Sequence, residues 1–158
     1  MDDAPVRASG VDAADEWQDR AYPYVASPSS MARWYRAKGF CSIERGDLEL
    51  AAAEFVFSCV FEPSVMAESE IQYMRGRFDV DYSSMEVEEA MGVLDRNGVP
   101  IGPSDLACGV LANGVQLALD AGEVGIAREC LADLYDLTGD EELVGLLEQL
   151  DEEIGKEG

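Results

Sequence analysis

Apolar residues recur at helical spacing along most of the chain, and this periodicity limits the fold more than any other feature of the sequence. One stripe, Leu48, Ala52, Phe55 and Cys59, occupies positions i, i+4, i+7 and i+11, which lie on one face of an α-helix. Two more stripes with helical spacing are Val124, Ala127, Leu131 and Leu134, and Leu143, Leu147, Leu150 and Ile154. Alternating patterns typical of strands are weak, so the sequence predicts an all-α fold from residue 30 onward.

Turn and capping signals divide these helices. Gly46, Gly122 and Gly139 each precede an acidic residue and can adopt positive φ at little cost. Residues 83–86 and 138–141 place Ser or Thr three positions before Glu, which fits the capping box at a helix N-terminus. Residues 97–103 form the longest predicted loop. The pattern is that of short helices joined by tight turns.

Ala51, Ala90 and Ala127 are each followed four residues later by a large apolar side chain, and these alanines are 39 and 37 residues apart. Such intervals are typical of two-helix repeats. In the first unit the order is Trp34-Tyr35, Gly39, Gly46, Ala51, Phe55, Ser58 and Pro63. This order resembles the tetratricopeptide repeat (TPR), in which small residues let two antiparallel helices approach closely.

The resemblance covers residues 32 to about 139 and is uneven. The third unit keeps Leu111, Gly122, Ala127 and Leu131, but it has Val115 in place of a small residue and Gly139 in place of proline. The middle unit keeps only Met74, Ala90 and Leu94. The resemblance implies stacked antiparallel helical hairpins, with residues 141–154 as a C-terminal capping helix. The alternative is an irregular helical bundle that contains two hairpins.

We expect two regions. Residues 1–29 form a partly ordered acidic arm, in which residues 11–22 make a short helix that the following prolines interrupt. Residues 30–158 form the TPR-like domain. Because the arm is acidic and carries Trp17 and Tyr22, it is also a candidate to occupy the domain's own groove.

Composition excludes several functions. The chain has 33 acidic and 11 basic residues, a net charge of −22, which argues against nucleic acid as a partner. No apolar run approaches the roughly 20 residues of a membrane span. The chain has no histidine, which excludes Ser-His and Cys-His catalysis and removes the commonest metal ligand. No phosphate-binding loop is present, and residues 79–90 fail the calcium-loop pattern at Ser84 and Ala90. We therefore expect no cofactor and no metal.

Four widely spaced cysteines and an acidic start without an apolar segment indicate free thiols in a cytoplasmic protein. The cysteines are Cys41, Cys59, Cys108 and Cys130.

Six of the 11 cations fall within residues 33–77. The TPR resemblance implies that the first helix of each repeat lines a concave groove, and the groove residues it selects are Arg33, Arg36, Phe40, Gln72 and Arg75. Such a groove suits an acidic or carboxylate-terminated peptide, although Phe40 stands where a carboxylate clamp has asparagine. The alternative is that these arginines pair with acids of the same chain.

The function favoured at this stage is a non-catalytic protein-interaction module, a scaffold or chaperone-like adaptor that binds a peptide or helix. The chain is similar in length, charge and repeat number to small bacterial secretion chaperones. The alternatives are an acidic inhibitor that mimics nucleic acid and, last, an enzyme that uses only carboxylates or a cysteine.

Phe57 and Phe61 lie outside the Phe55 stripe of the same helix. We expect them either to contact the next hairpin or to form an exposed patch for a partner or for a second copy in a homodimer.

Overall fold

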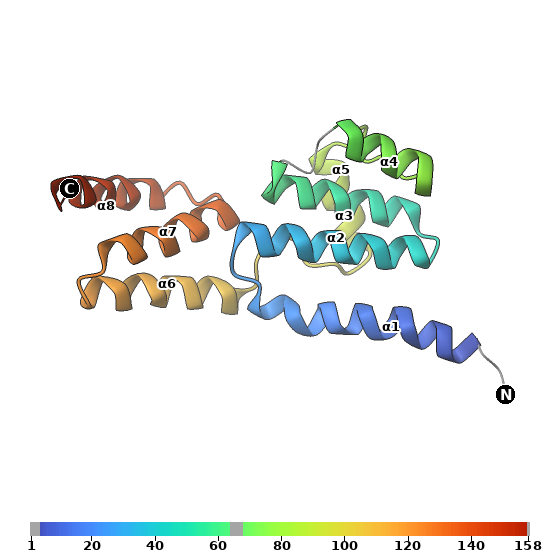
Figure 1. Ribbon diagram of the computed structural model, residues 1–158, viewed down its shortest axis with the longest axis horizontal. Coiled ribbons are helices and arrows are strands. Elements are labelled where there is room, and N and C mark those ends of the chain that lie inside the picture. The colour runs from blue at the N-terminus through green and yellow to red at the C-terminus, as the bar shows by residue number, and fades with distance from the viewer. Residues whose placement is uncertain (1–3, 64–67, 158) are drawn as a thin grey trace. The chain divides into compact units, whose positions relative to one another are not determined.

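The computed structural model describes residues 4–63 and 68–157, and every regular element in these ranges is helical (Figure 1). The prediction of an all-α fold is confirmed there. The α-helices are α1 (Ala4–Ala21), α2 (Pro28–Glu44), α3 (Leu48–Phe61), α4 (Glu68–Phe78), α5 (Val87–Arg96), α6 (Asp105–Asp120), α7 (Val124–Thr138) and α8 (Leu143–Glu157), and a short 3-10 turn spans Tyr22–Tyr24.

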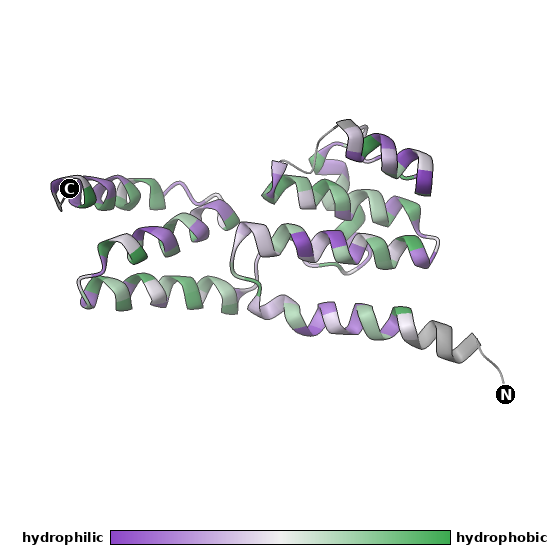
Figure 2. Cartoon of the chain, viewed as in Figure 1, coloured by the Kyte–Doolittle hydropathy of each residue, from purple (hydrophilic) through white to green (hydrophobic). Residues whose placement is uncertain are grey.

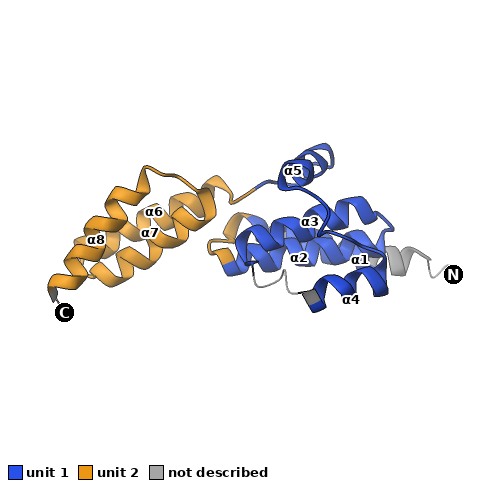
Figure 3. Ribbon diagram, turned by 90° about the horizontal axis from the view of Figure 1, so that it is seen from above, with its two compact units in different colours: residues 1–22, 29–101 blue, residues 23–28, 102–158 orange. Residues whose placement is uncertain are grey.

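The chain forms two compact units (Figure 3). Unit 1 comprises residues 1–22 and 29–101, and unit 2 comprises residues 23–28 and 102–158. Helices α1 to α5 belong to the first unit and α6 to α8 to the second.

The hairpin of α2 and α3 is the centre of unit 1, and its two helices meet at a glycine. A Cβ atom added to Gly39 on α2 would lie 2.9 Å from the Phe55 ring on α3, so only glycine admits this ring. Every residue of α3 from Ala51 to Cys59 is buried, as expected for a helix that is apolar on nearly all sides (Figure 2). Gly46, at φ 79°, makes the turn between the two helices, as predicted.

Helix α4 ends at a residue with positive φ that turns the chain back into unit 1. Asp79 has φ 59°, a conformation that Asp tolerates better than most residues. The amides of Asp79 and Val80 bond to the carbonyls of Arg75 and Met74, at 3.1 and 3.3 Å, as in a helix C-cap. Val80 and Tyr82 are thereby buried. Helix α5 then packs against α3.

Both predicted capping boxes are wrong. Helix α5 begins only at Val87, and the Ser83 hydroxyl donates to Asp81 (2.7 Å) instead of capping an amide. Thr138 is the last residue of α7, and its hydroxyl donates to the Leu134 carbonyl (2.8 Å). In neither place does the hydroxyl stand at the start of the helix: the N-cap of α5 is Glu86, and before α8 it is the Asp140 carboxylate that accepts from the Glu142 amide (3.0 Å).

Unit 2 consists of the α6–α7 hairpin with α8 packed on α7. Its core is a cluster of buried residues: Val115, Ala118, Ala127, Leu131 and Leu150. Gly122 and Gly139 have φ 75° and 67°, which confirms the two predicted glycine turns. Ser104 begins α6 by accepting a hydrogen bond from the Ala107 amide at 3.0 Å.

Replacing Gly39 with Ala tests the close approach of α2 and α3. We expect a loss of about 1–3 kcal/mol in the free energy of unfolding, because the new methyl group displaces the Phe55 ring. The matched control is Gly76→Ala on α4, where an added Cβ meets nothing within 4 Å. That change should gain about 0.5–1 kcal/mol. Urea unfolding followed by tryptophan fluorescence reports on unit 1 alone, because Trp17 and Trp34 both lie there. Equal effects at the two glycines would contradict the packing described.

Candidate functional site

The predicted groove residues lie on two helices of unit 1, and the structure brings two of them together. Arg36 and Phe40 are on α2, and the Arg36 guanidinium lies over the Phe40 ring at 5.6 Å. Arg36 also forms an ion pair with Glu70 on α4. Phe40 meets the Phe78 ring edge-on at 6.0 Å. Helices α2 and α4 are therefore joined by one ion pair and one aromatic contact.

The remaining predicted groove residues are more dispersed. Arg75 on α4 contacts Asp81 (3.2 Å) and donates to the Ser83 hydroxyl (2.9 Å). Arg33 on α2 is exposed, with a long contact of 3.5 Å to Ser29, and Gln72 on α4 is also exposed. Because Arg36 and Arg75 have partners within the chain, these contacts favour the alternative interpretation of the cations. The groove itself stays a prediction.

Lys38 on α2 and Arg45, the first residue after α2, pair with carboxylates of α1. The Lys38 ammonium donates to Asp15 (2.5 Å) and Asp19 (2.9 Å). Arg45 donates to Asp15 (2.7 Å) and Asp12 (2.8 Å). Burial opposes the charge on Asp15, yet hydrogen bonds from Lys38 and Arg45 hold the pKa of this carboxyl below its ordinary value. Burial likewise opposes the charge on Lys38, but its two aspartates raise the pKa of the ammonium.

Aromatic and polar contacts complete this junction. The Trp34 indole N–H on α2 donates to the Gln18 carbonyl on α1 at 2.6 Å, and the Tyr22 ring lies 5.0 Å from the Trp34 ring. Trp17, in contrast, is 66% exposed. The N-terminal residues thus contact α2 through Tyr22 and carboxylates, and Trp17 takes no part in the contacts described.

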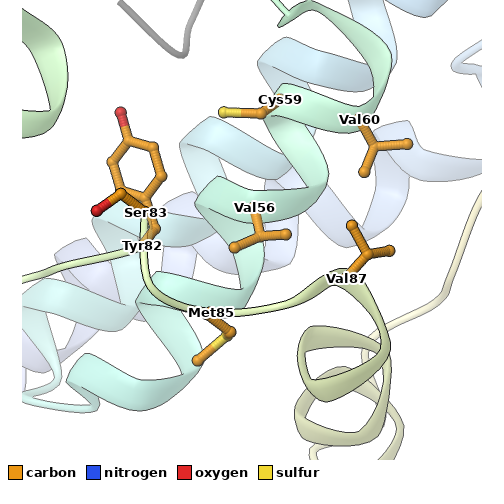
Figure 4. Close-up of a pocket in the computed structure, with 7 residues that line it drawn as sticks. All are labelled: Val56, Cys59, Val60, Tyr82, Ser83, Met85 and Val87. Carbon is orange, nitrogen blue, oxygen red and sulfur yellow. The ribbon is translucent and has the colours of Figure 1, made fainter. Parts of the chain in front are cut away.

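An apolar pocket of about 220 Å³ opens between α3 and the segment that leads into α5 (Figure 4). Figure 4 shows Val60 and Val87 on one side of this space, Tyr82 and Ser83 on the other, and Val56 between them. Cys59 and Met85 complete the lining. Val60 and Val87 are each 45% exposed, so the pocket has an apolar rim open to solvent.

The thiol and the phenol that line this pocket stay protonated at neutral pH. Burial raises the pKa of the Cys59 thiol to about 11, so the thiol stays protonated at neutral pH and is a poor nucleophile. Burial also raises the pKa of Tyr82 to about 12. The pocket is therefore suited to binding an apolar group and offers no activated nucleophile.

The sequence did not predict this pocket, and one of its two expectations for Phe57 and Phe61 was wrong. Phe57 is buried, and Phe61 stacks on Tyr35 of α2 at 6.0 Å. Neither side chain forms the exposed patch that was one of the two expectations for them. The lining residues come from positions 56–60 and 82–87, and no periodic signal connects these two segments.

Glu54 is a second feature that sequence reasoning missed. Its side chain is fully buried between α2 and α3, where Oε1 accepts a hydrogen bond from Ser42 at 2.5 Å. Oε2 has no hydrogen-bond partner among the described residues. Burial raises the pKa of this carboxyl to about 7, and the charges of Asp15 and Asp47 act in the same direction, while Ser42 and Lys38 oppose it. The only signal in the sequence is a single acid inside the apolar run 50–60.

Comparison of the chain with protein-family models, with curated proteins and with solved structures found no match. Within the described residues, no three His, Cys, Asp or Glu side chains gather as a metal site. Over the same residues no helix combines the length and apolarity needed to cross a bilayer.

The buried Glu54 predicts a pH-dependent stability for unit 1. Its pKa is raised from 4.5 to about 7, so the folded state binds more protons than the unfolded state between these values. The contribution of Glu54 to stability is therefore greatest below about pH 4.5, falls as pH rises from there to about 7, and is constant above that. The whole change is on the order of 3 kcal/mol.

Urea unfolding at pH 5, 6, 7 and 8, followed by tryptophan fluorescence, measures this change. Two charged groups that act on Glu54 have pKa values displaced away from this window: that of Lys38 is raised above 10.5 and that of Asp15 is lowered below 3.8. The Glu54→Gln variant should be flat across it, whereas Glu49→Gln, an exposed change on the same helix, should keep the wild-type slope. A flat wild-type profile would contradict the buried, protonated carboxyl.

Proposed function

We propose that the chain is a non-catalytic protein-interaction module built from TPR-like helical hairpins, and that its apolar pocket receives a side chain of a bound peptide or helix. The TPR-like arrangement is supported by the glycine-mediated approach of α2 and α3. The contacts of α2 with α4, through Arg36 and Glu70, and of α3 with α5 fit hairpins that stack like on like.

The observation that carries the proposal is the pocket at Val56, Val60 and Val87. A volume of about 220 Å³ accommodates one Leu, Met or Phe side chain, and the solvent-exposed valines at its rim provide apolar surface around that anchor. Pockets of this kind, filled by one apolar anchor, dominate the energetics of peptide recognition.

The negative charge of the chain favours a partner segment that carries basic residues beside its apolar anchor. Glu86 lies between the lining residues Met85 and Val87, and it makes no side-chain capping hydrogen bond. The chain as a whole has a net charge of −22. A segment with an apolar anchor next to Lys or Arg is therefore attracted, and an acidic segment is repelled. This differs from the acidic peptide expected for the arginine-lined groove, because Arg36 and Arg75 are already paired.

Selection from a random 12-residue peptide display library tests this function. We expect the enriched peptides to share one large apolar residue flanked by Lys or Arg. Val60→Glu and Val87→Glu should each weaken binding of a synthetic selected peptide at least tenfold. Both valines are half-exposed, so these variants should fold.

The matched control is Ile126→Glu on α7, an exposed apolar residue of unit 2, which should bind like the wild type. Binding should also weaken as salt rises from 0.05 to 0.5 M, since attraction to the basic residues is screened. Peptides that bind all variants equally, or a library that yields no enrichment, would contradict the proposed pocket.

A second candidate is the acidic inhibitor that mimics nucleic acid. The observation in its favour is that residues 102–158 hold 14 acidic residues and only two cations, Arg128 and Lys156. Arg128 pairs with Asp151 (2.9 Å) and Lys156 with Glu153 (3.6 Å). If this candidate holds, basic DNA-binding domains should bind the chain in competition with duplex DNA, and Val87→Glu should leave that binding intact.

A further inference from the structure

The face of α2 that contacts α1 presents hydrogen-bond donors of positive or neutral charge in a strongly acidic chain. Trp34, Lys38 and Cys41 follow one another at i, i+4 and i+7, so they lie on one side of α2. Arg45, the first residue after α2, continues this side, because its amide still bonds to the Cys41 carbonyl at 3.1 Å. The Trp34 indole, the Lys38 ammonium and the Arg45 guanidinium supply only donors. A partner of this face therefore has to supply hydrogen-bond acceptors, namely several carboxylates and one carbonyl.

Helix α1 supplies that complement. Asp12, Asp15 and Asp19 are at i, i+3 and i+7 of one helix face and make four ion pairs with Lys38 and Arg45. The Gln18 carbonyl, which accepts from Trp34, lies in the last turn of α1, where carbonyls lack intrahelical partners. Recognition therefore uses features that any acidic helix with the same spacing can present.

Packing holds α1 far less firmly than charge does. None of its described side chains, residues 10–21, is buried, and Trp17 is 66% exposed. A pocket of about 220 Å³ separates Gly10, Val11 and Ala14 of α1 from Phe40, Cys41 and Glu44 of α2. In α3, by contrast, every residue from Ala51 to Cys59 is buried. Salt should screen the contacts of α1 and leave those of α3 intact.

From this contrast we propose that the Trp34/Lys38/Arg45 face of α2 is a binding surface for acidic helices, and that α1 is its displaceable internal occupant. The partner is a helix with carboxylates at i, i+3 and i+7. Covalent attachment gives α1 an effective concentration in the millimolar range, so a free helix competes only when α1 is loosened or when its own contacts are better. This surface is distinct from the apolar pocket of the proposed function.

The test measures binding of a labelled peptide of residues 4–22 to the full chain at 0.05 M salt by fluorescence anisotropy. The loosened chain carries Asp12→Asn, Asp15→Asn and Asp19→Asn. We expect it to bind the peptide at least tenfold more tightly than the wild type does. The same three changes in the peptide should abolish binding.

Two chain variants act as controls. Glu16→Gln removes a carboxylate of α1 that is exposed and pairs only with Arg20 in the contacts described, so it should behave as the wild type. Adding Lys38→Met and Arg45→Met to the loosened chain should remove peptide binding, while circular dichroism shows the helix content retained. Equal binding by the loosened and wild-type chains would overturn the proposal. So would a loosened chain that dimerises but takes no peptide, because the face would then accept only a second copy.

If the loosened chain does not fold, a measurement on the wild-type chain tests whether α1 is displaced from α2. Cys41 is half-buried and borders the pocket between α1 and α2, so its alkylation reports on displacement of α1. Mass spectrometry should show alkylation of Cys41 by N-ethylmaleimide at least threefold faster in 0.5 M than in 0.05 M NaCl, with Cys59 unchanged. Cys41 and Cys59 rates that are both independent of salt would overturn the proposal.

Discussion

The contact between Gly39 and the Phe55 ring is the constraint on which the rest of unit 1 depends. It sets the distance between α2 and α3, and Phe55 in turn stacks on Tyr82 at 5.6 Å and meets Phe40 at 5.3 Å. Tyr82 lines the apolar pocket, and Phe40 reaches toward α4. One glycine thus sets the spacing of the hairpin and places the Phe55 ring against which Tyr82, a wall of the proposed binding site, packs.

Several cations of unit 1 form ion pairs within the same unit. Arg36, Lys38, Arg45 and Arg75 each pair with an acid of unit 1, and these pairs join α2 to α1 and α4, and α4 to the segment that follows it. Exposed ion pairs contribute little stability, whereas the Lys38 ammonium, which is buried, depends on its aspartates. The net charge of −22 is why the proposed partner of the pocket is basic, whereas the proposed partner of the face beneath α1 is an acidic helix.

Sequence predicted the helices and the glycine turns because both depend on local periodicity and on backbone conformation at Gly46, Gly122 and Gly139. It failed at the two capping boxes, because α5 begins only at Val87, beyond Ser83, and Thr138 belongs to the end of α7. The apolar pocket escaped prediction since its walls come from segments 56–60 and 82–87, which only the turn at Asp79 brings together. The pairing of Lys38 and Arg45 with α1 escaped too, because a sequence with 33 acids does not say which of them a cation meets.

We infer that α2 holds α3 by packing and α1 by charge, and the Trp34 indole reports on this difference most directly. In a proton–nitrogen NMR spectrum the two indoles give separate signals, and only Trp34 donates to α1. Raising NaCl from 0.05 to 0.5 M should move the Trp34 indole signal toward that of the exposed Trp17 and speed its exchange with solvent, while the Phe55 amide stays protected. A Trp34 indole signal that does not change with salt, or that loses protection from exchange together with the Phe55 amide, would contradict this account.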